Sequence, residues 1–151
     1  MLGLHPKSIM VSLEGTVKLI DFRSAVCVNR NQMIVPVFKP TYRLDGLVNK
    51  LRYVAPEVLN GQPYNEKADI YSMGILFWQL LTGKTPFSKL TSAESFFTDV
   101  ASGGLRPKID GRTDPIVAKL IQSCWRADHT LRPSAGEALQ MMETLVPEDS
   151  I

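Results

Sequence analysis

The stretch NEKADIYSMGILFWQLLTG, residues 65–83, is the clearest helical signal in the chain. Asn65 is a suitable N-cap, because its side-chain oxygen can accept a backbone N–H of the first helical turn. Gly83 is a suitable C-terminal stop, and Pro86 follows shortly after it. From Ile70 to Leu81 the helix is apolar nearly all the way round, which is typical of a helix with other elements packed on every side. The sequence therefore predicts a domain built around this helix.

Shorter helical signals surround the central segment. Three further helices are predicted over residues 92–101, 114–125 and 134–145, and in the last two the apolar residues recur at helical spacing. A first-turn proline predicts a short helix over residues 56–59. Ser134, with Glu137 three residues later, has the pattern of a capping box. These helices predict a bundle around the central one.

The N-terminal part of the chain has a different pattern. The runs IMVS and TVKLI are separated by LEG, which predicts a small β-hairpin whose second strand is buried and leads to Asp21. Residues 29–50 show no clear periodicity, which is usual for a disordered or functional segment. The predicted fold class is mainly α, with a short hairpin and a helical bundle around one buried helix.

Composition restricts the function. The 151 residues suit one domain, and the net charge of +2, from scattered basic residues, argues against a nucleic-acid partner. The two cysteines lack metal-binding spacing, which indicates free thiols in a reducing compartment. No signal peptide is recognisable, and the longest apolar run, ILFWQLL, is far below the roughly 20 residues of a membrane span. We therefore expect a cytoplasmic protein with no membrane partner.

Five motifs, in order along the chain, resemble the C-terminal lobe of a protein kinase. HPKSIMV is similar to the end of the catalytic loop, DFR (21–23) to the D-F-G motif, and LRYVAPE to the segment that ends in A-P-E. DIYSMG (69–74) resembles D-x-W-S-x-G, and CWRADHTLRPS resembles the segment that carries the family's arginine, here Arg132. The stretch YSMGILFWQLLTGKTPF resembles the tyrosine-kinase-like branch of the family most. Five motifs in register across nearly the whole chain are far more specific than any one of them.

The resemblance implies one kinase-like domain over residues 1–151, consisting of the C-terminal lobe only, with the N-terminal lobe absent. The activation segment would cover residues 21–57 approximately, and the helical subdomain residues 58–146. Glu57 and Arg132 would form a buried structural ion pair that ties these two parts together. Asp69 would anchor the catalytic loop by accepting its backbone N–H groups.

The resemblance also implies that the catalytic motifs are degraded. Aligning LHPKS with H-R-D-L-x-x-x-N puts Gly3 at the catalytic Asp position and Ser8 at the metal-binding Asn position. Glycine cannot orient a substrate hydroxyl, and a serine hydroxyl is a weak, neutral metal ligand. Asp21 remains at the metal-ligand position as a vestigial, weak site. Arg23 replaces the glycine of D-F-G, and either pairs with Asp21 in place of magnesium or points to solvent.

Hydroxyl groups of the activation segment are candidate phosphorylation sites: Thr41, Tyr42 and Tyr53. Tyr53 matches the tyrosine that precedes A-P-E in the family, whereas Asn49 and Lys50 replace a Gly-Thr pair. The alternative for the first two hydroxyls is an ordinary polar loop.

These residues favour a catalytically inactive, pseudokinase-like fragment that acts as a protein-binding or scaffold module and needs no cofactor. The first alternative is a part of a Ser/Thr protein kinase that uses ATP and magnesium and whose N-terminal lobe lies outside this chain. The second is a truncated product without a selected role. In this last case the loss of an N-terminal lobe predicts exposed apolar surface on the loop and hairpin side.

Overall fold

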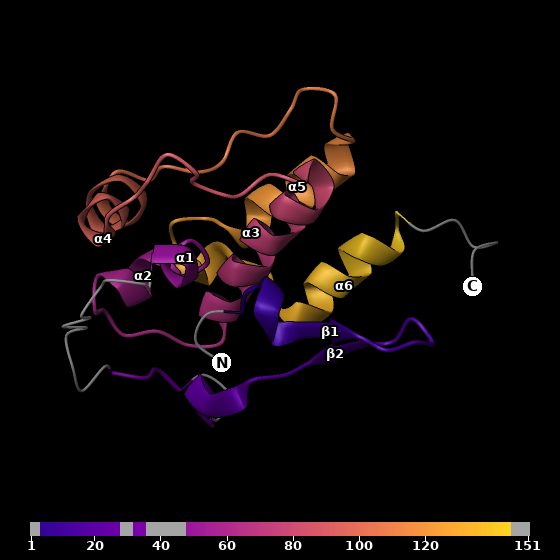
Figure 1. Ribbon diagram of the computed structural model, residues 1–151, viewed down its shortest axis with the longest axis horizontal. Coiled ribbons are helices and arrows are strands. Elements are labelled where there is room, and N and C mark those ends of the chain that lie inside the picture. Colours follow the sequence, from indigo (N-terminus) through magenta and orange to yellow (C-terminus); the bar gives the residue numbers. More distant parts are fainter. Residues whose placement is uncertain (1–3, 28–31, 36–47, 146–151) are drawn as a thin grey trace.

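The computed structural model describes residues 4–27, 32–35 and 48–145, and Figure 1 shows their arrangement. A two-stranded antiparallel hairpin precedes a mainly helical body, so the predicted fold class is confirmed. The described elements are η1 (Pro6–Ser8), β1 (Ile9–Val11), β2 (Val17–Leu19), η2 (Phe22–Ser24), α1 (Val48–Leu51), α2 (Pro56–Leu59), α3 (Lys67–Thr82), α4 (Ala93–Ser95), η3 (Phe96–Ser102), α5 (Pro115–Cys124), η4 (His129–Leu131) and α6 (Ala135–Glu143).

Local side-chain chemistry determines where α3 begins and ends. The Asn65 side-chain oxygen accepts the backbone N–H of Lys67 at 3.0 Å, so Asn65 caps the helix although the residue at its boundary is Glu66. At the other end Gly83 has a φ of 67°, and its N–H donates to the carbonyl of Gln79 at 2.7 Å. Glycine adopts this left-handed conformation without a steric penalty, which explains why the helix stops there.

The burial of α3 differs from the prediction in its last turn. Tyr71 and Ile75 are fully buried in the middle of the helix, as expected. Leu80 and Leu81, however, are 76% and 47% exposed, because the C-terminal end of α3 extends beyond the elements that surround its middle. The prediction of a helix covered on every side is therefore wrong for this end.

The helices α3 and α5 lie side by side, as Figure 1 shows, and their close approach depends on Gly74. A Cβ atom at this position would lie 2.8 Å from the Cβ of Cys124, closer than two carbon atoms pack. The helix α6 then packs against α5. Its start is a capping box, as predicted: Ser134 accepts the N–H of Glu137, and Glu137 accepts the N–H of Ser134.

The segment predicted as a helix over residues 92–101 is helical, but its hydrogen bonding is not uniform. The short α4 continues directly into η3, a π-helix. Phe96 and Val100 on η3 are buried in the core that also contains α3. The short helix α1 was not among the predicted elements, since residues 29–50 carry no periodic pattern.

The hairpin has the predicted strands but not the predicted burial. Ile9 pairs with Leu19 and Val11 with Val17, and Gly15 in the turn has a φ of 81°. All three residues of β2 are exposed, which contradicts the expectation of a buried strand. Its apolar side chains face solvent because none of the described elements covers them. The expected exposed apolar surface on the hairpin side is therefore present. Among the described residues, no helix is both long enough and apolar enough to cross a bilayer.

Candidate functional site

Asp21 lies two residues beyond the end of β2, at the start of η2. Its φ of 63° is in the left-handed region, which Asp tolerates better than most residues. The 3-10 turn that follows returns Arg23 to the Asp21 carboxylate. The Arg23 Nε donates to one carboxylate oxygen at 2.7 Å, and a terminal nitrogen donates to the other at 2.9 Å. Of the two alternatives left open by the sequence, the structure therefore has the ion pair.

The surroundings of Asp21 are basic. An open pocket of about 560 Å³ is lined by Asp21, Arg23, Lys7 and Lys50, together with His5 and Ile20. The hydrogen bonds from Arg23 lower the pKa of the Asp21 carboxyl to about 2, and the charge of Lys50 acts in the same direction. Asp21 is therefore an anion at neutral pH whose counter-charges belong to the protein itself.

Ser8 lies close to this pocket, but its hydroxyl is already bonded. The carbonyl of Ser8 accepts the N–H of Ile20 at 2.9 Å, which ties η1 to the residue before Asp21. The buried hydroxyl donates to the carbonyl of His5 at 2.7 Å and accepts the His5 N–H at 3.0 Å. It closes a local turn and does not extend toward the carboxylate. Gly3, the position aligned with the catalytic Asp, lies outside the described residues, as do Thr41 and Tyr42.

Glu57 and Arg132 form the predicted buried ion pair. Two nitrogens of Arg132 donate to the two Glu57 oxygens at 2.7 and 2.8 Å, and the Arg132 side chain is 0% exposed. The remaining donors of Arg132 reach the carbonyls of Arg126, Lys67 and Ala127. All five N–H donors of the guanidinium are therefore satisfied. The pair connects α2 with the loop before α6, across 75 positions of sequence.

Arg106 contacts the same Tyr71 ring as Arg132, and no sequence pattern predicted this. Its guanidinium carbon lies 5.0 Å from the centre of the Tyr71 ring, and that of Arg132 lies 5.2 Å from the same ring. The Nε of Arg106 also donates to the carbonyl of Trp125 at 2.9 Å. Burial lowers the pKa of Arg106 and raises that of Tyr71 to about 12. An isolated arginine in a loop carries no pattern that would have indicated this position.

Tyr53 is buried, in contrast to an accessible phosphorylation site. Its hydroxyl donates to the side chain of Gln79, and its carbonyl accepts the hydroxyl of Ser72 at 2.6 Å. Phosphorylation of Tyr53 stays a prediction, and it requires the structure around Tyr53 to open. Asp69 lies in the first turn of α3, where burial raises its pKa. Its predicted contact with the catalytic loop is not tested by the described residues.

The hairpin, the A-P-E helix α2, the buried α3 and the Glu57–Arg132 pair together define the lower lobe of a protein kinase. Comparison with known proteins agrees with this class. The sequence profile of the protein kinase domain matches residues 3–142. The chain therefore belongs to the protein kinase family.

Three relatives illustrate this membership. The chain is 41% identical over 97 residues to the serine/threonine-protein kinase STY17 of Arabidopsis thaliana, which covers 64% of this chain and 17% of that protein. It is 39% identical over 99 residues to the dual specificity protein kinase shkD of Dictyostelium discoideum, covering 66% and 13%. It is 35% identical over 139 residues to a probable serine/threonine-protein kinase of the same organism, covering 92% and 9%. The dual-specificity name is consistent with the tyrosine-kinase-like branch. The chain thus spans less than a fifth of the length of each of these relatives.

Proposed function

We propose that this chain is a non-catalytic kinase-like lobe that works as a protein-binding module, without ATP or magnesium. The observation that carries the proposal is the bidentate contact between Arg23 and Asp21. Both oxygens of the carboxylate that would hold magnesium are bonded to a cation of the protein.

The electrostatics of this pocket do not fit a magnesium ion. Mg²⁺ is usually held by one or two carboxylates together with the phosphates of the substrate. Here one carboxylate is surrounded by Lys7, Arg23 and Lys50, so the lining carries a net positive charge. A dication would have to displace Arg23 and overcome repulsion by the two lysines. Ser8 offers no compensating ligand, because its hydroxyl is used by the backbone of His5.

The position of Gly3 supports the same proposal from the sequence. A catalytic-loop Asp positions the substrate hydroxyl in protein kinases, and glycine has no side chain for this task. The exposed apolar residues of the hairpin, among them Val11, Leu13 and Val17, favour a binding role. Apolar surface of this kind indicates contact with another protein surface, either from a longer chain or from a partner. Both cysteines are free, and we propose a cytoplasmic location on that basis.

The alternative is a part of an active Ser/Thr kinase whose remaining parts lie outside this chain. The names of the relatives favour it, as does the presence of Asp21 at the metal-ligand position. In this alternative a bound nucleotide would supply the phosphates that draw magnesium to Asp21.

Thermal unfolding of the chain with and without ATP and magnesium tests the proposal. We expect no magnesium-dependent stabilisation of the chain by ATP. A nucleotide present at 100 times its dissociation constant would add about 2.7 kcal/mol, which is easily detected. Such a stabilisation, if it depends on magnesium, would disprove the proposal.

Two arginine variants show whether Arg23 is the cause. Arg23→Gly frees the Asp21 carboxylate, and we expect it to gain weak magnesium affinity in isothermal titration. Arg112→Gly is the matched control, because Arg112 makes the same bidentate contact to Asp110 two residues away. Equal magnesium affinity in both variants would mean that any freed carboxylate suffices and that Arg23 has no special role.

A further inference from the structure

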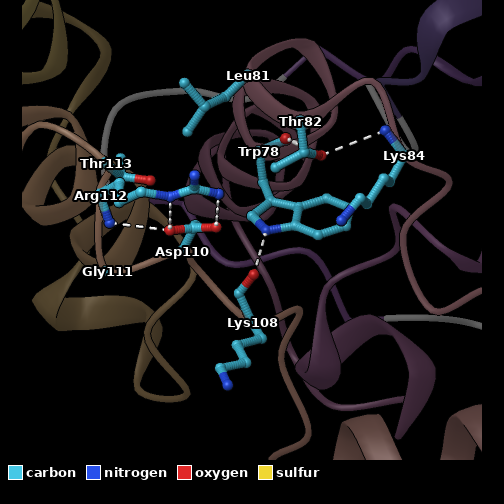
Figure 2. A pocket seen from close by; sticks show the side chains of 9 residues that line it. All are labelled: Trp78, Leu81, Thr82, Lys84, Lys108, Asp110, Gly111, Arg112 and Thr113. Carbon is cyan, nitrogen blue, oxygen red and sulfur yellow. Dashed lines mark hydrogen bonds and ion pairs between the residues drawn. The ribbon is translucent and has the colours of Figure 1, made fainter.

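An open groove lies where the C-terminal end of α3 meets the loop that leads into α5, and Figure 2 shows it from close by. Its volume is about 850 Å³, which is within the range of ligand-binding clefts. We call it the α3–α5 groove and define it by six of its lining residues: Trp78, Leu81, Lys84, Lys108, Asp110 and Arg112. None of these residues belongs to the pocket around Asp21.

The charge of the groove is strongly unbalanced. Its lining holds three basic residues and one carboxylate, a net charge of +2, which equals the net charge of the whole chain. Arg112 and Asp110 neutralise each other through two hydrogen bonds of 3.0 and 3.1 Å. The ammonium groups of Lys84 and Lys108 form no ion pair or hydrogen bond within the described part of the chain. Both lie near enough to Asp110 for their charges to lower its pKa. Two unpaired cations are therefore available to a ligand.

The wall of the groove is apolar and held in place. The Trp78 indole is 6% exposed, and its N–H donates to the carbonyl of Lys108 at 2.9 Å, which fixes the loop against α3. The loop is further closed by the Thr113 N–H, which donates to the Asp110 carbonyl at 3.0 Å. Leu81 lines the same groove and is nearly half exposed. In Figure 2 the indole lies between Leu81 and the Lys108 backbone. A preformed wall lowers the ordering cost of binding.

We propose that the α3–α5 groove binds an acidic segment of a partner protein, whose carboxylates face Lys84 and Lys108 and whose apolar side chain packs on Leu81. The inference rests on the proposed function, for which it names a surface and the chemistry of the partner. Complementary charge supplies attraction and steering, and the apolar contact supplies the area that becomes desolvated.

A nucleic acid suits the groove less well. Single strands bind by stacking bases on exposed aromatic faces, and the buried indole of Trp78 offers no such face. An acidic protein segment needs only the two ammonium groups and the exposed leucine.

The test uses fluorescence anisotropy with the full chain and a short fluorescein-labelled peptide in which leucines are flanked by glutamates. We expect saturable binding that weakens as salt is raised, since exposed charges are screened. Lys84→Glu/Lys108→Glu should weaken binding by about tenfold or more, which corresponds to about 1.4 kcal/mol. Leu81→Ser should weaken it as well, and a peptide with serine in place of leucine should bind less tightly than the original.

The matched control is Lys89→Glu/Lys119→Glu, which changes the net charge equally at two exposed lysines outside the groove. We expect it to change the affinity by less than about twofold, because distant exposed charges are screened. Thermal unfolding checks that each variant is folded. Lys84→Gln/Lys108→Gln replaces the charge-reversal variant if that one fails to fold.

Three outcomes overturn the inference: no binding of the peptide, equal weakening by both double variants, or tighter binding of an oligothymidylate of the same charge than of the peptide. These results are independent of the ATP and magnesium experiment. If the peptide fails while nucleotide also fails to bind, the non-catalytic function stands and only the groove is wrongly assigned.

Discussion

Replacing Arg132 by Met breaks the contact that joins α2 to the loop before α6. The Arg132 side chain is fully buried and donates to both oxygens of Glu57, which is itself only 6% exposed in its side chain. The variant keeps an apolar side chain of similar length in the space but leaves the Glu57 carboxylate buried without its cation. It also removes the hydrogen bonds to three backbone carbonyls, those of Lys67, Arg126 and Ala127.

The expected loss of stability follows from this burial. Removing one partner of a buried ion pair costs about 3–5 kcal/mol, because the other charge is left uncompensated. A natural domain has a free energy of unfolding of about 5–15 kcal/mol, so the loss is a large fraction of the total. For a chain of this size it corresponds to a fall of about 6–20 °C in the unfolding temperature. Urea unfolding followed by circular dichroism measures the free energy directly.

The control variants identify the mechanism. Arg112→Met removes an exposed ion pair, and we expect it to change the free energy of unfolding far less than Arg132→Met does. Glu57→Leu combined with Arg132→Met removes both charges, and should be more stable than Arg132→Met alone. An Arg132→Met variant no less stable than the Arg112→Met control would refute the reasoning. A double variant that loses the full sum of the two single effects would show that stranded charge is not the cause.

Three further predictions concern local geometry. Gly74→Ala should destabilise the fold by about 1–3 kcal/mol in urea unfolding, because the new Cβ would clash at the contact between α3 and α5. Gly136→Ala is the control: its new Cβ would meet no atom within 4 Å, and the variant should stabilise the fold by about 0.5–1 kcal/mol. The pKa of the Asp21 carboxyl, measured by NMR titration, should lie near its lowered value of about 2 and should return toward its ordinary value in Arg23→Gly. Because the pKa is depressed in the folded state, the stabilisation by the Arg23–Asp21 pair is present above about pH 4 and is lost as the pH falls toward 2. An unchanged pKa in the variant would contradict the contact. Burial raises the pKa of Cys124 to about 11, so iodoacetamide at neutral pH should alkylate the exposed cysteine in the native protein and reach Cys124 only after unfolding.

Sequence patterns predicted the features that depend on neighbouring residues. The cap at Asn65, the stop at Gly83 and the capping box of Ser134 all form within one helical turn, and all are present. The Glu57–Arg132 pair joins residues that are 75 positions apart, and only the resemblance to kinases predicted it. The periodic pattern of apolar residues does not indicate which residue pairs with a buried charge.

Burial was predicted less well, because it depends on which elements lie alongside. The apolar strand β2 reads as a buried strand, yet no described element covers it. Leu80 continues the apolar pattern of α3 but lies beyond the packed part of the helix. Arg106 shows the opposite case, a charged side chain that is drawn inward by the Tyr71 ring and a backbone carbonyl. Each outcome is a property of the tertiary arrangement.

The pocket around Asp21 and the packing of the helices in this lobe are held by separate interactions. The Glu57–Arg132 pair and the α3–α5 contact involve none of the residues that line the pocket around Asp21, so neither contact depends on the Asp21 carboxylate. A single position then decides the state of that carboxylate. With glycine at position 23 no side chain could return to Asp21, whereas arginine reaches both oxygens through a 3-10 turn of three residues. Local geometry within η2 is therefore sufficient to hold the Asp21 carboxylate in an ion pair with Arg23.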